Sequence, residues 1–73
     1  MKRGGETMNS IEEFAEIIKN RRKRALFTQQ DLADESKVSV STIRDLERGE
    51  LKDIKISTVQ KLCKTLNIVF KIK

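Results

Sequence analysis

The side chains in this sequence that could do chemistry are mainly arginines and lysines, while the residues that catalysis uses most are scarce. The chain of 73 residues has no histidine and a single cysteine, so it offers no imidazole base and no second thiol for a disulfide. That cysteine, Cys63, falls on an apolar face with Val59, Leu62 and Leu66, where a thiol packs as a small hydrophobic group. We therefore expect no enzyme, no metal and no cofactor.

The surplus of basic residues favours an anionic partner. The chain has 16 Lys and Arg against 11 Asp and Glu, a net charge of +5. Residues 1–27 carry seven basic and four acidic side chains, residues 28–49 carry three and five, and residues 50–73 carry six and two. Since the central segment is the least basic, charge alone does not explain a binding function.

The elements that must position these side chains are helices. Apolar residues recur at spacings of three and four, and each run begins at a serine or threonine that can accept a hydrogen bond from a backbone N–H of the first turn. Three of these starts read as capping boxes, with a polar partner three residues later. The predicted start residues are Ser10, Thr28, Ser39 and Ser57.

The expected helix ends complete the prediction of a small all-α domain of four to five helices. The first helix should end near Arg24 and the second near Ser36, with Gly49 and Asn67 as the left-handed residues that end the other two. The alternation of residues 38–41 (Val-Ser-Val-Ser) suggests a strand, but we interpret it as the approach to the cap at Ser39. The helical domain is predicted to span residues 10–67.

The two ends of the chain are interpreted differently. Residues 1–9 are expected to be a disordered tail, because they combine charge with a pair of glycines. Residues 68–73 (IVFKIK) alternate in character and predict a β-strand. A lone strand leaves its backbone unpaired, so we expect it to pair with the strand of a second copy through Val69, Phe70 and Ile72. Extension of the fourth helix, or packing on the same subunit, is the alternative.

The run TQQDLADESKVSVSTIRDLERGE, residues 28–50, resembles the helix-turn-helix of the lambda-repressor/Cro-like (XRE) family. The likeness extends over residues 10–67 and rests on pairs at fixed offsets, such as Thr28-Gln29 and Leu32-Ala33. One departure is Lys37, where many members have glycine, at a cost of about 1 kcal/mol if φ is positive. The resemblance implies a sequence-specific repressor that places its third helix in the major groove of double-stranded DNA.

The resemblance also implies a role for individual residues. Arg44 is expected to contact guanine, because its planar fork matches two acceptors on that base. Glu47 is expected to form a structural ion pair with Arg22, which joins the third helix to the first. The predicted base-reading residues are Ser39, Val40, Ser41, Arg44 and Asp45. The predicted phosphate contacts are Gln29, Arg48, Lys52 and Lys55.

The strand at the end of the chain resembles that of HipB-type antitoxins. This likeness implies a cytoplasmic homodimer on a palindromic operator, with a HipA-type kinase toxin as partner and repression of its own operon. A phage-type or mobile-element regulator without a toxin is the nearest alternative. A protein-interaction module without sequence-specific DNA binding is a further one, suggested by the acidic excess of residues 28–49.

Overall fold

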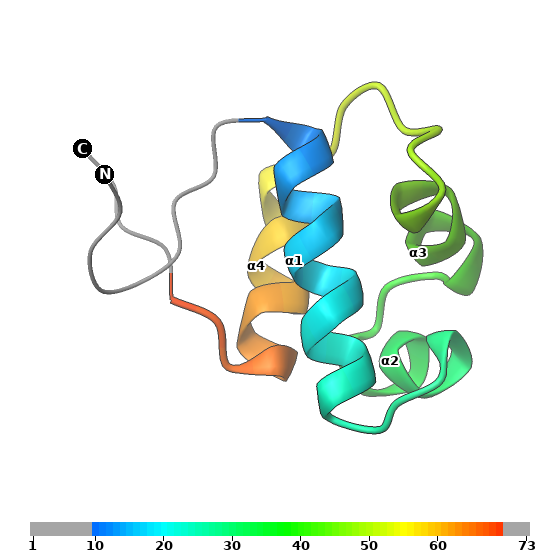
Figure 1. The fold of residues 1–73 in the computed structure, drawn as a ribbon, viewed down its shortest axis with the longest axis vertical. Coiled ribbons are helices and arrows are strands. Elements are labelled where there is room, and N and C mark those ends of the chain that lie inside the picture. The colour runs from blue at the N-terminus through cyan, green and yellow to red at the C-terminus, as the bar shows by residue number, and fades with distance from the viewer. Residues whose placement is uncertain (1–9, 70–73) are drawn as a thin grey trace.

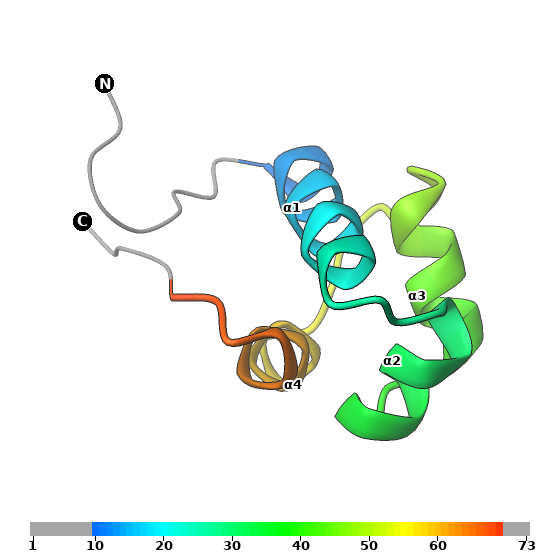
Figure 2. The same cartoon turned by 60° about the horizontal axis from the view of Figure 1, so that its bottom comes forward.

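The computed structural model describes residues 10–69 and contains four helices and no strand within that range (Figure 1). The helices are α1 (Ile11–Arg24), α2 (Gln29–Ser36), α3 (Val40–Glu47) and α4 (Ile56–Leu66). Helix α1 packs against both α3 and α4, and α2 also packs against both. Helices α3 and α4 therefore lie on different sides of the domain, as Figures 1 and 2 show. The prediction of a small all-α domain is confirmed for the described residues.

Three helices begin at the residues that the sequence predicts. The side-chain oxygen of Ser10 accepts a hydrogen bond of 3.1 Å from the N–H of Glu13. Thr28 and Asp31 form the full capping box, with reciprocal hydrogen bonds of 2.9 Å. Ser39 accepts a 3.2 Å bond from an N–H in the first turn of α3. Local hydrogen bonds of this kind satisfy amides that a helix leaves unpaired at its start.

The predicted start of α4 is wrong. The helix begins at Ile56, after Lys55, and no side chain caps it, so Ser57 and Gln60 lie inside the helix instead of forming a capping box. Its first intrahelical bond runs from the N–H of Val59 to the carbonyl of Lys55, at 3.0 Å. The preceding loop packs Leu51 and Ile54 against the core, and this packing sets where the chain enters the helix.

Every helix is followed by a residue in the left-handed region, and only one of these residues is glycine. The four residues are Leu26, Lys37, Gly49 and Asn67, with φ values of 63°, 64°, 77° and 58°. After α1, α3 and α4 the next N–H reaches back to a carbonyl of the last turn, which is a Schellman motif. Those bonds are Phe27 to Arg22 at 3.0 Å, Glu50 to Asp45 at 2.9 Å and Ile68 to Cys63 at 2.8 Å.

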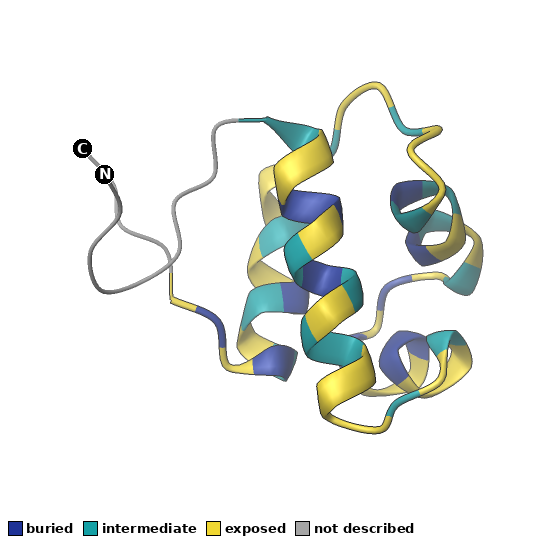
Figure 3. Ribbon diagram, viewed as in Figure 1, coloured by how far each residue is buried: buried dark blue, intermediate teal, exposed yellow. Residues whose placement is uncertain are grey.

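The core lies where all four helices meet (Figure 3). Its largest side chains, each less than 2% exposed, are Phe14, Ile18, Leu32, Ile43, Leu46 and Leu62. Cys63 is half-buried against this cluster, and burial raises the pKa of its thiol. A thiol with a raised pKa is a poor nucleophile, so the side chain serves packing.

The C-terminal segment differs in part from the sequence-based interpretation. Ile68 is 7% exposed and belongs to the core, and its N–H completes the end of α4. It therefore packs on its own subunit, while the next residue, Val69, is 69% exposed. Phe70 and Ile72 of the predicted dimerisation strand lie outside the described residues, as does the predicted tail of residues 1–9.

Candidate nucleic-acid interface

A three-residue turn joins α2 to α3, and buried contacts hold its shape. Lys37 takes the left-handed conformation, and its N–H donates to the carbonyl of Ala33 at 2.9 Å. The next residue, Val38, is 7% exposed and anchors the turn in the core. Its N–H lies 3.3 Å from the hydroxyl oxygen of the buried Ser36, which itself donates to the carbonyl of Leu32 at 2.6 Å. The turn thus fixes the direction of α3 relative to α2.

Helix α3 presents one apolar and one polar face. Ile43 and Leu46 are 0% and 1% exposed and define the inward side. At about 100° per residue, Ser41 projects nearly opposite to them, and Arg44 and Asp45 flank it. Ser41 and Arg44 are exposed and Asp45 is half-buried. The structure therefore brings three of the five predicted base-reading side chains together on the outward face of one short helix.

The other two predicted base-reading residues lie at the start of α3 and are more restricted. The hydroxyl of Ser39 is exposed, but it donates to Oγ1 of Thr42 at 2.8 Å while it caps the helix. Val40 is half-buried and packs against the core. The predicted site residues did not include Thr42, whose side chain orients the Ser39 hydroxyl. Its position three residues after the N-cap was the available signal.

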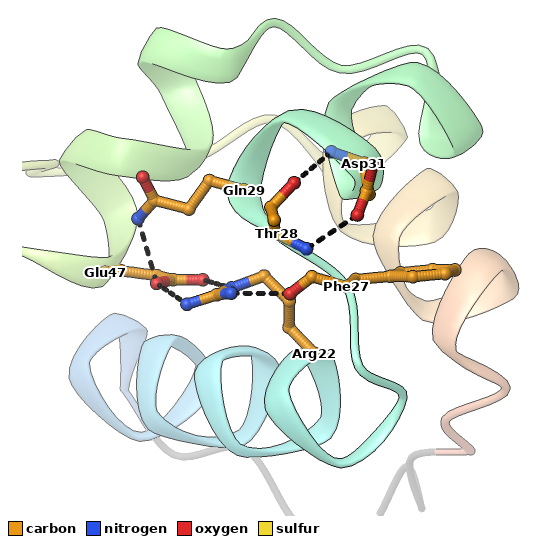
Figure 4. A network of polar contacts seen from close by, with 6 residues as sticks. All are labelled: Arg22, Phe27, Thr28, Gln29, Asp31 and Glu47. Carbon is orange, nitrogen blue, oxygen red and sulfur yellow. Dashed lines mark hydrogen bonds and ion pairs between the residues drawn. The ribbon is translucent and has the colours of Figure 1, made fainter.

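The pair of Arg22 and Glu47 joins α1 to α3 beneath this surface (Figure 4). Nε of Arg22 donates to Oε2 of Glu47 at 2.8 Å and Nη2 donates to Oε1 at 3.0 Å, which makes the contact bidentate. The third guanidinium nitrogen donates to the carbonyl of Phe27 at 2.7 Å. The two side chains are 11% and 4% exposed. Because both charged groups are almost fully buried, the pair is not available to contact DNA. Its role is to hold α1 and α3 in their relative positions.

Gln29 extends the same network to the beginning of α2. Its Nε2 donates to Oε1 of Glu47 at 3.0 Å, as Figure 4 shows. Glu47 thus accepts hydrogen bonds from side chains of two other helices, α1 and α2. No sequence pattern predicts this contact, because the two residues are 18 positions apart and belong to different helices. The network fixes Gln29, a predicted phosphate contact, relative to α3.

The remaining predicted phosphate contacts follow α3 in the chain. Arg48 is 57% exposed, and its Nε lies 3.9 Å from a carboxylate oxygen of Glu50, a distance too long for a hydrogen bond. Exposed pairs of this kind are weak, so the guanidinium can exchange this partner for an anion. Lys52 and Lys55 are exposed, the first in the loop after α3 and the second directly before α4.

Within residues 10–69 no cluster of side chains has the composition to hold a metal ion, and no helix is long and apolar enough to span a membrane. What the described residues do contain is two short helices joined by a fixed turn, with the polar face of the second helix exposed. This arrangement defines the class of helix-turn-helix DNA-binding domains.

Comparison with protein families agrees with the geometry. A family model described as "Helix-turn-helix" matches residues 18–69, which is more than half of the chain. The chain belongs to this helix-turn-helix family, of the lambda-repressor/Cro-like (XRE) type. It is therefore a DNA-binding regulator of that type. No curated protein matches the chain.

Proposed function

We propose that this protein is a dimeric, sequence-specific repressor that binds a palindromic operator through α3 of each subunit. The observation that carries the proposal is the outward face of α3, where Ser41 and Arg44 are exposed while Ile43 and Leu46 are buried. A single helix with such a polar face fits the width of the major groove of B-DNA.

The roles at the base edges follow from the chemistry of each side chain. Arg44 can donate two hydrogen bonds to one guanine, and Ser41 can donate to or accept from either base of a pair. Asp45 can accept from the amino group of cytosine. Val40 can contact the methyl group of thymine, and Ser39 supports the start of the helix while it faces solvent. Arg44 supplies the most specific of these contacts.

The phosphate contacts set the register of the helix on the duplex. One N–H of the Gln29 amide is used by Glu47, so the second N–H remains to donate to a phosphate oxygen. The start of α2 adds the attraction of a helix N-terminus for an anion. Because the amide is already oriented, ordering it on DNA costs little entropy. Arg48, Lys52 and Lys55 add positive charge on the chain that follows α3.

A selection of binding sites from random duplex DNA tests sequence specificity and symmetry together. We expect an enriched palindrome whose half-sites are about 34 Å apart, one turn of the duplex. Arg44→Ala should cost about 1–3 kcal/mol and relax the preference at one base pair. Arg48→Ala should weaken binding to all sequences alike and lower the salt slope by about one.

Lys61→Ala is the control for these variants, because it removes one exposed charge from α4, which carries none of the proposed DNA contacts. It should leave the sequence preference unchanged. If no site is enriched, the protein is an interaction module instead of a sequence-specific repressor. If Arg44→Ala binds the selected site as well as the native chain does, Arg44 does not read a base.

The proposed dimer uses the C-terminal segment, where Val69 is 69% exposed beyond the end of α4. Val69→Lys places a charge in the proposed two-stranded interface and should dissociate the dimer in sedimentation experiments. Ile56→Lys is a matched control, since Ile56 is also 69% exposed but lies at the start of α4. Equal effects of both substitutions would argue against an interface at Val69.

We further propose that the biological role is that of a HipB-type antitoxin, which binds a HipA-type kinase toxin and represses its own operon. The C-terminal segment of alternating apolar and basic residues supports this role. Co-expression with a HipA-type kinase should yield a stable complex on size-exclusion chromatography. A chain that binds its operator but never co-elutes with such a kinase would instead be a phage-type or mobile-element regulator.

A further inference from the structure

A groove between α2 and α4 is lined by basic residues around an aromatic ring. It lies between the end of α2, the end of α4 and the corner that joins α1 to α2, and it has a volume of about 460 Å³. Its lining residues are Phe27, Glu35, Ser36, Lys37, Lys61, Lys64 and Thr65. Three lysines against one glutamate give the groove a positive charge.

The attraction of a cation to the carbonyl end of a helix explains the positions of only two of these three lysines. Lys37 directly follows α2, and Lys64 lies in the last turn of α4, where a cation complements the exposed carbonyls. Lys61 lies a turn earlier, beyond the reach of that effect. Its position beside the other two is explained neither by helix capping nor by an ion pair among the described residues.

The corner beside the groove carries an apolar side chain in an unfavourable place. Leu26, which directly precedes Phe27, is 88% exposed and has a φ of 63°. A leucine is less favourable than glycine in the left-handed region, and a side chain so exposed contributes nothing to the core. The left-handed backbone ends α1, but the end of a helix does not require an exposed leucine, so the side chain is free to contact a partner.

We propose that Leu26, Phe27 and the lysines at positions 37, 61 and 64 form a docking surface for an acidic segment of a partner protein. The apolar corner would take an aliphatic side chain of that segment, and the lysines would pair with the carboxylates that flank it. None of the residues that line the groove belongs to α3, so the partner and the base edges of DNA would contact different side chains.

The charge of the groove favours an acidic partner segment over the two occupants that the chain itself could supply, its own terminal segments and a second copy. The terminal segments outside the described residues carry Lys2, Arg3, Lys71 and Lys73 against the single acidic residue Glu6, so the lysines would repel them. A symmetric dimer through this face would place the lysines of two copies together, which is unfavourable for the same reason. A groove lined by residues from two helices and from the corner before α2 suits an extended peptide chain.

The test uses the full chain and a fluorescein-labelled peptide, Asp-Glu-Leu-Leu-Glu-Asp, with Lys-Arg-Leu-Leu-Arg-Lys as the control of reversed charge. Fluorescence anisotropy should detect binding of the acidic peptide alone. The double substitution Lys61→Glu, Lys64→Glu should weaken its binding at least about tenfold, since like charges repel across an interface. The matched pair Lys52→Glu, Lys55→Glu makes the same change in net charge outside the groove and should leave the affinity nearly unchanged.

Leu26→Gly separates docking from folding, because it removes the apolar contact while it relieves the strained backbone. We expect this variant to bind the acidic peptide more weakly although it melts at a higher temperature. The proposal is overturned if the acidic peptide does not bind, if the basic peptide binds equally well, or if both double substitutions weaken binding alike. It is also overturned if the groove pair lowers affinity for random duplex DNA as much as the loop pair does, since the groove would then contact the DNA backbone.

Discussion

Removal of Arg22 tests how much of the fold depends on its contact with Glu47. Arg22→Met keeps most of the side-chain volume but removes the hydrogen bonds of 2.8 and 3.0 Å to the carboxylate and the bond of 2.7 Å to Phe27. Glu47, whose side chain is 4% exposed, then keeps only the neutral amide of Gln29 from this network. Breaking a buried ion pair on one side costs about 3–5 kcal/mol.

The expected loss is large compared with the stability of the whole domain. At 0.05–0.15 kcal/mol per residue, a chain of 73 residues is stable by roughly 4–11 kcal/mol. The 11% exposure of the Arg22 side chain admits some water, so we expect a loss of about 3 kcal/mol, at the lower end of the range. Circular dichroism can monitor unfolding in urea. If the free energy of unfolding falls by about 1 kcal/mol per molar urea, the loss should lower the unfolding midpoint by up to about 3 M.

Two further variants make the test decisive. Arg48→Met breaks an exposed contact, 57% exposed on each side and 3.9 Å long, and should cost at most about 1 kcal/mol. The double substitution Arg22→Met, Glu47→Met removes both charges and should recover most of the lost stability, because no buried carboxylate remains. The reasoning is refuted if Arg22→Met costs no more than Arg48→Met, or if the double variant is as unstable as the single one.

Substitutions at three other positions probe helix ends and the thiol. Leu26→Gly should stabilise the fold by about 1 kcal/mol and raise the melting temperature by roughly 4–8 °C, whereas Leu26→Ala, which keeps a Cβ at positive φ, should not. Thr28→Ala removes the capping box of α2 and should cost about 1 kcal/mol in urea unfolding, and an unchanged midpoint would contradict the role of the cap. Burial raises the pKa of the Cys63 thiol, so the unfolded chain loses this proton first as the pH rises. Stability from this group is therefore complete below about pH 8.5 and decreases above it, and the decrease should be absent in Cys63→Ala.

The helix starts were predictable where one side chain bonds to a backbone group three residues away. Thr28 and Asp31 can be recognised from spacing alone, and the structure confirms them. The same spacing failed for Ser57 and Gln60, because packing of the preceding loop decides where α4 begins. A capping pattern gives a local preference, and tertiary contacts overrode it here.

The helix ends near Arg24 and Ser36 were predicted and are confirmed, but the left-handed residue itself was predictable only where the residue type favours that region. Gly49 and Asn67 do so, but Leu26 does not, and nothing in the sequence marked it as a chain reversal. Ile68 was assigned to a strand because it begins an alternating run. A Schellman motif also commonly has an apolar residue directly after its left-handed position, and Ile68 meets that need.

The candidate interface was partly visible in the sequence. Periodicity separates the buried Ile43 and Leu46 from the exposed Arg44, so the outward face of α3 followed from the sequence. The pairing of Arg22 with Glu47 came from resemblance to a family, and the contact of Gln29 was missed. Side chains on different helices meet only once the helices have packed, and no local pattern encodes such a contact.

The four left-handed stops have a consequence for how the domain folds. Each stop closes through hydrogen bonds between residues no more than five positions apart, so local contacts set where a helix ends. Packing must still stabilise the helices, because helices of eight residues such as α2 and α3 are marginal alone, but it does not have to select their ends. Refolding is expected within microseconds to milliseconds, the range of helical domains with mostly local contacts.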